Sequence, residues 1–125
     1  MPARTLLLVE DNPDTVEFLS KRLVEAGYGV LVARNGVDAL RLATQEVPSA
    51  VVLDINLPQL NGDEVCRRLR GQSATARIPV IFVTAETSQR VQDLLEPGLT
   101  VCLEKAIKSK TLLAALDEIL GPVTP

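Results

Sequence analysis

Residues with reactive side chains follow the apolar runs of this chain, at the point where each run ends. The apolar runs cover residues 6–9, 50–53, 79–83 and 100–103. The carboxyl ends of parallel strands meet at one edge of a sheet, and ligands bind in the crevice outside them. Three carboxylates, a hydroxyl and an ammonium group are therefore expected to converge on one site for a divalent cation and a phosphoryl group. The residues that carry these groups are Glu10, Asp11, Asp54, Thr84 and Lys105.

The carboxylates predict a metal site. Three carboxylates in one crevice repel one another, and a bound divalent cation removes that repulsion. Mg2+ takes oxygen ligands in octahedral geometry, usually carboxylates, waters and a substrate phosphate. We therefore predict an Mg2+ site in which Asp11 and Asp54 bind the ion directly. Glu10 is expected to act through a water molecule, and Asn56, two residues past Asp54, through its backbone carbonyl.

The same cluster predicts a covalent phosphoryl acceptor. Carboxylates can hold a phosphoryl group only if one of them accepts it covalently, because no stronger nucleophile follows these strands. Asp54 is central among the strand ends and is the predicted acceptor. Lys105 is expected to supply a positive charge from the far side of the crevice, and Thr84 a hydroxyl donor.

The elements that must position these residues follow from the hydrophobic pattern. Apolar runs of strand length alternate with segments of helical period, which predicts right-handed crossovers and a parallel sheet with helices on both faces. The strands at 6–9, 50–53 and 79–83 are almost wholly apolar, as buried central strands are. The strands at 30–33 and 100–103 fit the edges better. This pattern predicts a flavodoxin-like, doubly wound α/β fold with five parallel strands in the order 2-1-3-4-5.

Helix boundaries are predicted from capping and breaking residues. Asn12, followed by Pro13, is the predicted N-cap of the first helix, and Asn35-Gly36 is predicted to open the second. A capping box between Asn61 and Glu64 predicts a third helix that ends at Arg70. The last two helices are predicted at roughly 88–96 and at about 112–120.

The composition is that of one globular domain. The chain has 125 residues, of which 46% are hydrophobic and 23% charged, and its net charge is −3. We predict a domain over 1–121 and a short tail or linker stub over 122–125. The negative charge argues against nucleic-acid binding, and the arginines within 67–70 are predicted to lie on a solvated helix face. Because the chain contains no histidine, histidine-based catalysis and a structural zinc site are excluded. A signal peptide and a spanning segment are not recognisable, which predicts a cytoplasmic location.

Taken together, these motifs resemble those of the receiver domain of two-component response regulators. Segments 9–12, 54–62, 79–85 and 104–105 resemble the acidic signature, the phospho-acceptor loop and the remaining two motifs of that family, and the resemblance covers about residues 4–121. It implies that Asp54 accepts a phosphoryl group from a histidine kinase or phosphotransfer protein, with Mg2+ bound, and so switches the binding of an output domain or protein. It also implies that the protein catalyses only its own phosphorylation and dephosphorylation, and is not otherwise an enzyme. Asn56 and Glu86 resemble the pair of residues that tunes dephosphorylation.

Two residues depart from the family pattern. Cys102 stands where most members have a Tyr or Phe that moves inward on phosphorylation, and Ala106 stands where most have a proline after a cis peptide bond. A cis bond without proline costs about 2.5–4 kcal/mol, so the peptide between Lys105 and Ala106 is expected to be trans. We also expect that signalling does not pass through a rotating ring on the fifth strand.

Three other functions are compatible with parts of the sequence. A degenerate receiver that binds partners without phosphate is favoured by Cys102 and disfavoured by the complete acidic cluster. A phosphatase of the haloacid dehalogenase type would need a second acid two residues after its nucleophile, where this chain has Asn56. Dinucleotide binding is excluded because Gly27-x-Gly29 follows a helix and lacks a third glycine.

Overall fold

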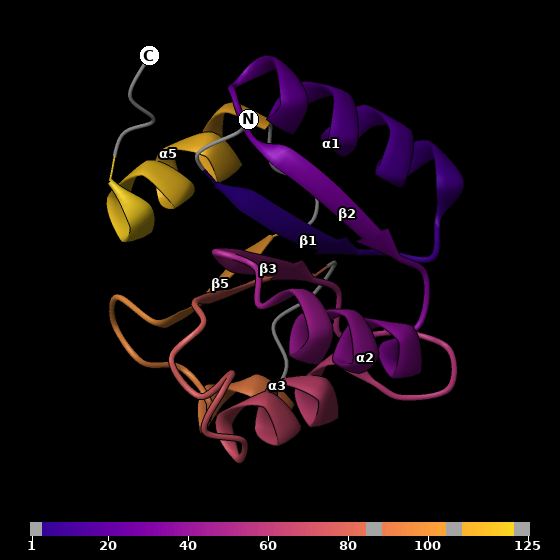
Figure 1. Ribbon diagram of the computed structural model, residues 1–125, viewed down its shortest axis with the longest axis vertical. Helices are drawn as coiled ribbons and strands as arrows, with labels where there is room; N and C mark the ends of the chain where they lie inside the picture. Colours follow the sequence, from indigo (N-terminus) through magenta and orange to yellow (C-terminus); the bar gives the residue numbers. More distant parts are fainter. Residues whose placement is uncertain (1–3, 85–88, 105–108, 122–125) are drawn as a thin grey trace.

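The computed structural model describes residues 4–84, 89–104 and 109–121, over which strands and helices alternate (Figure 1). The strands are β1 (Thr5–Val9), β2 (Gly29–Ala33), β3 (Ala50–Leu53), β4 (Val80–Thr84) and β5 (Thr100–Glu104). The helices are α1 (Pro13–Glu25), α2 (Gly36–Glu46), α3 (Gly62–Arg70), α4 (Gln89–Gln92) and α5 (Ser109–Leu120). Among the described residues, none of these helices is long and apolar enough to cross a bilayer.

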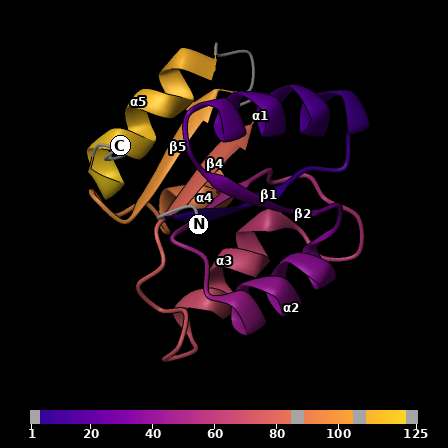
Figure 2. The ribbon, with the colours of Figure 1, turned by 45° about the horizontal axis from the view of Figure 1, so that its top comes forward.

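The strands of the described chain form one parallel, five-stranded sheet in the order β2-β1-β3-β4-β5. The predicted flavodoxin-like, doubly wound fold with strand order 2-1-3-4-5 is therefore confirmed. β3 is buried along its whole length, whereas β2 is partly exposed, as an edge strand should be. Helices α1 and α5 cover one face of the sheet, and α2 and α3 cover the other (Figures 1 and 2).

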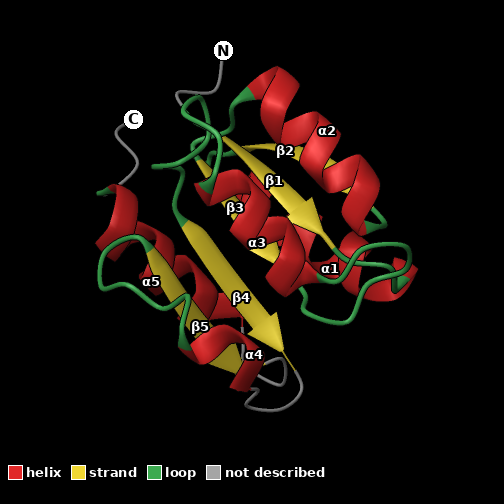
Figure 3. Cartoon of the chain, turned by 90° about the horizontal axis from the view of Figure 1, so that it is seen from below, coloured by secondary structure: helices red, strands yellow, loops and turns green. Residues whose placement is uncertain are grey.

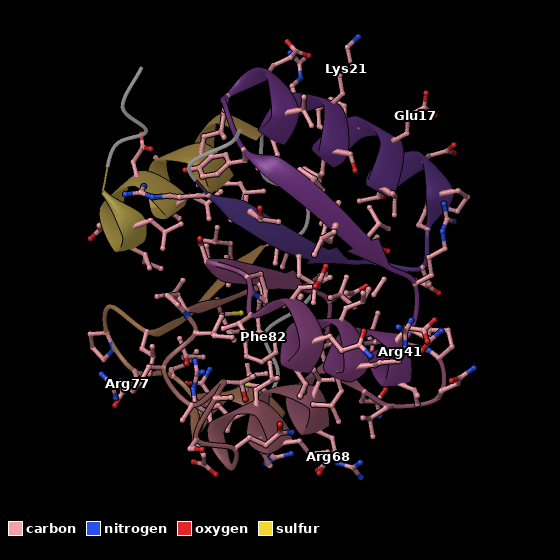
Figure 4. All side chains as sticks on the ribbon, viewed as in Figure 1. Glu17, Lys21, Arg41, Arg68, Arg77 and Phe82 are labelled. Carbon is pink, nitrogen blue, oxygen red and sulfur yellow. The ribbon has the colours of Figure 1, made fainter. Side chains whose placement is uncertain are left out.

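The sheet divides the hydrophobic core into two clusters, because successive side chains of a strand point to opposite faces. In β1, Leu7 and Val9 belong to the cluster under α2 and α3, whereas Leu6 and Leu8 belong to the cluster under α1 and α5. Phe82 of β4 is the largest fully buried side chain, and Figure 4 shows it inside the molecule, in contrast to the solvent-facing Lys21 and Glu17 of α1.

Asparagines cap the first two helices, of which the Asn12 cap is predicted from the sequence. The side chain of Asn12 accepts hydrogen bonds from the backbone of Asp14 at 2.9 Å and Thr15 at 3.3 Å, and Asn35 accepts one from Asp38 at 2.8 Å. These bonds satisfy N–H groups that the first turn of a helix leaves without a partner.

The predicted capping box at the start of α3 is wrong. Asn61 is the N-cap residue, but its side chain makes no capping hydrogen bond. Glu64 instead receives a hydrogen bond from Arg68 at 3.1 Å and lies 3.9 Å from Arg67. An arginine one turn later offers Glu64 a charged partner, and that partner is favoured over the backbone N–H of the cap.

Helix α4 ends four residues before its predicted end at residue 96, and its predicted first residue, Ser88, lies outside the described residues. Glu96 and Thr100 exchange two backbone hydrogen bonds, of 2.9 and 2.8 Å, which form an isolated antiparallel bridge. This bridge draws the chain toward the start of β5, so the last predicted turn of α4 cannot form.

Arg70 does not lie on a solvated helix face, which corrects the prediction for the arginines within 67–70. Its guanidinium donates to the carbonyl of Ile78 at 2.7 Å and to the hydroxyl of Thr100 at 2.7 Å. It also lies within hydrogen-bond distance of the carbonyls of Ala76 and Leu99. Arg70 therefore ties the end of α3 to the starts of β4 and β5. Its neighbours Arg67 and Arg68 are exposed, as predicted.

The ends of the described chain meet at one side of the sheet. Arg4 donates a hydrogen bond to the carbonyl of Gly121 at 2.5 Å, which links the residue before β1 to the residue after α5. The two ends of the described chain are thus tied together, while the predicted tail at 122–125 lies outside the described residues.

A strained residue ends α2. Val47 has φ 43° and ψ 67°, a left-handed conformation that costs a β-branched side chain free energy, and this side chain is exposed. We expect Val47→Gly to raise the free energy of unfolding by about 0.5–1 kcal/mol, because the relief of backbone strain exceeds the entropic cost of glycine. Urea unfolding followed by circular dichroism measures this change.

The control for this prediction is Val37→Gly. Val37 is as exposed as Val47 but lies within α2 at ordinary helical geometry. Glycine there should lower the stability by a few tenths of a kcal/mol or more. If both substitutions destabilise the protein equally, the left-handed residue carries no net strain.

Candidate functional site

The acidic residues predicted to converge do so at the carboxyl ends of β1 and β3. These strands pair in register up to Val9 and Leu53, and the N–H of Asp54 donates to the carbonyl of Val9 at 3.2 Å. One carboxylate oxygen from each of Glu10, Asp11 and Asp54 lies within 4.8 Å of the others. The sheet thus brings residues 44 positions apart into one cluster, as the sequence predicts.

The three carboxylates differ in exposure and in backbone support. Glu10 and Asp54 are buried, with exposed fractions of 3% and 5%, whereas Asp11 is exposed. An oxygen of Glu10 accepts the N–H of Asn12 at 3.1 Å, and an oxygen of Asp54 accepts the N–H of Asn56 at 3.3 Å. Each buried carboxylate is therefore oriented by the loop that follows it, while Asp11 forms the solvent side of the cluster.

This cluster fits a hard divalent cation. Like charges this close repel one another in a partly buried site, and all three side chains offer oxygen. An all-oxygen donor set with a solvent-accessible side suits Mg2+, which keeps several waters, and does not suit zinc, which prefers nitrogen and sulfur ligands. Asn56 is exposed and two residues past Asp54, where its carbonyl can complete the protein ligands.

A glycine holds the loop that carries Asp54. The N–H of Gly62, the first residue of α3, donates to the carbonyl of Ile55 at 2.8 Å. A Cβ atom on Gly62 would lie 2.1 Å from the carbonyl oxygen of Asp54, so any side chain there would displace the backbone of the acidic residue. The helix therefore packs directly on the site only because position 62 is glycine.

The remaining predicted site residues lie at or beyond the ends of β4 and β5. Thr84 ends β4 and pairs in register with Glu104, which directly precedes Lys105. Figure 3 shows β1 and β4 running in the same direction. The parallel register of β3, β4 and β5 thus places Thr84 next to the residue before Lys105, at the same edge of the sheet as Asp54. Lys105, Glu86 and Ala106, and with them the peptide predicted to be trans, lie outside the described residues.

Cys102 lies on β5 beside Phe82 of β4 and packs against the core cluster under α2 and α3. It is half-buried, and burial raises the pKa of its thiol. At neutral pH Cys102 is therefore a small neutral side chain rather than a thiolate nucleophile.

Two close backbone contacts at the site were not predicted from the sequence. The sequence places Gly62 only in the acceptor-loop motif and Gly36 only at the start of a helix, although both closely approach the backbone of the loop after β3. Asn35-Gly36 and Asn61-Gly62 are the signals that mark these contacts, but the same dipeptides are also ordinary turn and helix-start sequences.

Comparison with known proteins identifies the family. A sequence profile for the response regulator receiver domain matches residues 6–117. Protein PilH of Pseudomonas aeruginosa is 36% identical in an alignment 119 residues long that covers 93% of this chain and 97% of PilH. Response regulator MprA of Mycobacterium sp. (strain KMS) is 39% identical in an alignment 127 residues long, gaps included, that covers 100% of this chain but only 54% of MprA. The chain thus spans about half the length of the MprA relatives and nearly all of PilH.

A solved structure supports the same assignment. The receiver domain of sensor histidine kinase PA1611 from Pseudomonas aeruginosa superposes with a TM-score of 0.85 at 32% identity, over 94% of this chain and 98% of that domain. That crystal structure has a magnesium ion coordinated in its active site cleft. By sequence and by fold, this chain belongs to the response regulator receiver domain family.

Proposed function

We propose that this protein is a phosphorylation switch in which Asp54 is the phosphoryl acceptor. The observation that carries the proposal is the position of Asp54, buried at the end of β3 with Glu10 and Asp11 around it. A carboxylate oxygen of Asp54 attacks the phosphorus of the donor, a phosphorus–oxygen bond to Asp54 forms, and the bond from phosphorus to the leaving group breaks. With a phosphohistidine donor, the leaving group is the imidazole nitrogen of a histidine kinase or phosphotransfer protein.

The neighbouring residues are proposed to serve this one transfer. Glu10, Asp11, Asp54 and the carbonyl of Asn56 would hold Mg2+, which neutralises charge between the carboxylates and the incoming phosphoryl group. The magnesium ion in the PA1611 receiver domain supports this assignment.

Further roles are proposed for residues at the ends of β4 and β5. Lys105 pairs with the phosphoryl oxygens, and Thr84 donates its hydroxyl to them. Asn56 and Glu86 flank the group and set the rate at which water removes it. The protein then acts only on its own phosphoryl group, consistent with its family, and a cytoplasmic location remains the prediction from sequence.

The output of the switch is proposed to be the binding of a further domain or protein, without direct contact to nucleic acid by this domain. A degenerate receiver that binds partners without phosphate is the second candidate. One observation favours it: the position of the usual aromatic ring on β5 holds the small, half-buried Cys102. The intact carboxylate cluster favours the phosphorylation switch.

The function is tested by intact mass after incubation with acetyl phosphate. In the presence of Mg2+ we expect a mass gain of one phosphoryl group, which hydroxylamine removes because an acyl phosphate is labile to nucleophiles. With EDTA in place of Mg2+ the gain should be lost. An unchanged mass under all conditions would favour the degenerate receiver, and full labelling in EDTA would contradict the metal assignment.

We further predict that Cys102 is not the moving part of the switch. Its side chain is too small to have rotamers that differ much in exposed surface, so Cys102→Ala should keep the phosphate-dependent change of the protein. The measurement is the set of amide chemical shifts with Mg2+, with and without beryllofluoride. Cys66→Ala is the control, because it removes a fully buried thiol from the core cluster against which Cys102 packs. A response lost only in Cys102→Ala would make residue 102 part of the switch.

A further inference from the structure

The segment between β2 and α2 contacts both of the loops that carry the acidic residues. At its start, the carbonyl of Ala33 accepts the N–H of Glu10 at 3.1 Å. At its end, the N–H of Gly36 donates to the carbonyl of Pro58 at 3.2 Å. A single short segment therefore joins the loop after β1 to the loop after β3, on the side of the site away from β4 and β5.

The contact at Gly36 is a direct backbone-to-backbone approach. A Cβ atom on Gly36 would lie 1.8 Å from the carbonyl oxygen of Leu60 and 2.6 Å from its carbonyl carbon. Contacts this short do not occur, and the atoms in the way are the backbone carbonyl and the Cβ of Leu60 rather than the end of a flexible side chain. Any side chain at position 36 must therefore displace the loop after β3 or the start of α2.

The part of the loop under Gly36 is strained. The N–H of Leu60 donates to the carbonyl of Pro58 at 2.8 Å, which closes a three-residue turn with Gln59 at its centre. Gln59 has φ 70°, which is costly for a residue other than glycine. Pro58 thus accepts two N–H groups, one from its own turn and one from Gly36. A strained turn persists only where its surroundings hold it, and Gly36 provides the contact from outside the loop.

This turn directly follows the proposed metal ligands. Pro58 is two residues past Asn56 and four past Asp54. Other hydrogen bonds also hold this loop: Asp54 donates to the carbonyl of Val9, Asn56 donates to an oxygen of Asp54, and Gly62 donates to the carbonyl of Ile55. Only Leu57 separates Pro58 from Asn56, so a shift of the turn at Pro58 would move the carbonyl of Asn56.

We propose that Gly36 is a positioning residue for the Mg2+ site, an inference that rests on the proposed function. It touches neither the metal nor the phosphoryl group. By its lack of a side chain, it lets the first turn of α2 hold the Pro58–Leu60 turn, and so fixes the distance between the carboxylate of Asp54 and the carbonyl of Asn56. The start of α2 is then part of the site, although α2 supplies no ligand.

The test is Mg2+ affinity, measured by calorimetry and by amide shifts in the absence of any phosphodonor. Gly36→Ala should weaken Mg2+ binding by about tenfold, the usual effect of disturbing a residue that orients metal ligands. With acetyl phosphate, the Mg2+ concentration for half-maximal labelling should rise by a similar factor. The labelling rate at saturating Mg2+ should change little, because Asp54 itself is intact.

Two controls separate positioning from general destabilisation. Gly71→Ala places a methyl group at ordinary contact distance, 3.6 Å from the carbonyl oxygens of Arg67 and Arg68, and should leave Mg2+ binding unchanged. Leu69→Ala removes a fully buried side chain near the end of α3 distant from the site, and should lower stability without altering Mg2+ affinity. If Gly36→Ala does not fold, a double variant that also carries Gln59→Gly should fold, because glycine at position 59 allows the turn to change conformation. We expect this double variant to bind Mg2+ as weakly as predicted for Gly36→Ala.

The outcomes distinguish this inference from the proposed function. If the wild-type protein neither binds Mg2+ nor becomes labelled, the proposed function is wrong. If the wild type does both, and Gly36→Ala, or its double variant with Gln59→Gly, binds Mg2+ with wild-type affinity, the positioning role is wrong. An equal loss of affinity in Leu69→Ala would also overturn it, because the effect would then follow stability alone.

Discussion

Asp54→Asn should abolish labelling by acetyl phosphate. The amide keeps the size of the side chain but removes the nucleophilic carboxylate, and no other residue of the cluster occupies the central position at the end of β3. The mass gain expected of the wild type should disappear at every Mg2+ concentration. Residual labelling at the wild-type rate would show that Asp54 is not the acceptor.

The same substitution should also remove the stabilisation that Mg2+ provides. A ligand at one hundred times its Kd stabilises the folded state by about 2.7 kcal/mol, and Asp54→Asn removes one of three carboxylates from the site. Thermal unfolding with and without Mg2+ measures the difference. Asp14→Asn is the matched control, because Asp14 is an exposed carboxylate in the first turn of α1, outside the cluster. A loss of labelling in that variant would point to net charge rather than to the acceptor.

Arg70→Met should lower the free energy of unfolding by about 2–4 kcal/mol. Methionine retains much of the aliphatic length but donates no hydrogen bonds, so the hydroxyl of the buried Thr100 and the carbonyl of Ile78 lose their charged donor. Hydrogen bonds to a charged group contribute about 1.5–3 kcal/mol, and buried acceptors without partners add a desolvation cost. Urea unfolding followed by circular dichroism measures the loss.

Arg68→Met is the control for this prediction. Arg68 lies two positions away on the same helix, and Figure 4 shows it on the outside of the molecule. Its hydrogen bond to the partly exposed Glu64, at 3.1 Å, is open to solvent. An exposed pair of this kind contributes well under about 1 kcal/mol. Equal losses in the two variants would mean that the contacts of Arg70 to β4 and β5 add no stability beyond that of a surface ion pair.

The strand order and the carboxylate cluster could be predicted because both follow from local patterns. Each central strand is an unbroken apolar run, and the carboxylate residues of the cluster directly follow two of these runs. Once β1 and β3 are neighbours in a parallel sheet, Glu10 and Asp54 must lie at the same edge. The carboxyl ends of neighbouring parallel strands lie side by side, so residues far apart in the sequence can be predicted to lie close together.

What could not be predicted depends on partners far along the chain. Arg70 donates a hydrogen bond to Thr100, 30 positions away. The three arginines within 67–70 have the pattern of a surface helix face, which does not distinguish Arg70 from its neighbours. The bridge between Glu96 and Thr100 overrides the helical tendency at the end of α4. The predicted capping box is wrong for a different reason. Two arginines on the same helix compete with the backbone N–H of the N-cap for the carboxylate of Glu64.

The exposed side of β2 has a consequence for how this protein behaves in concentrated solution. In the part of the chain that the structure describes, β2 pairs with β1 alone, so its outer edge is open to a strand from another molecule. Neither proline nor a charged residue interrupts Gly29–Ala33, and Val32 is exposed. Edges without such interruptions are prone to intermolecular strand addition and aggregation. Arg34, directly after the strand, is the nearest charge that opposes it. We therefore expect colloidal stability to depend on the outer edge of β2, which contributes no residue to the acidic cluster.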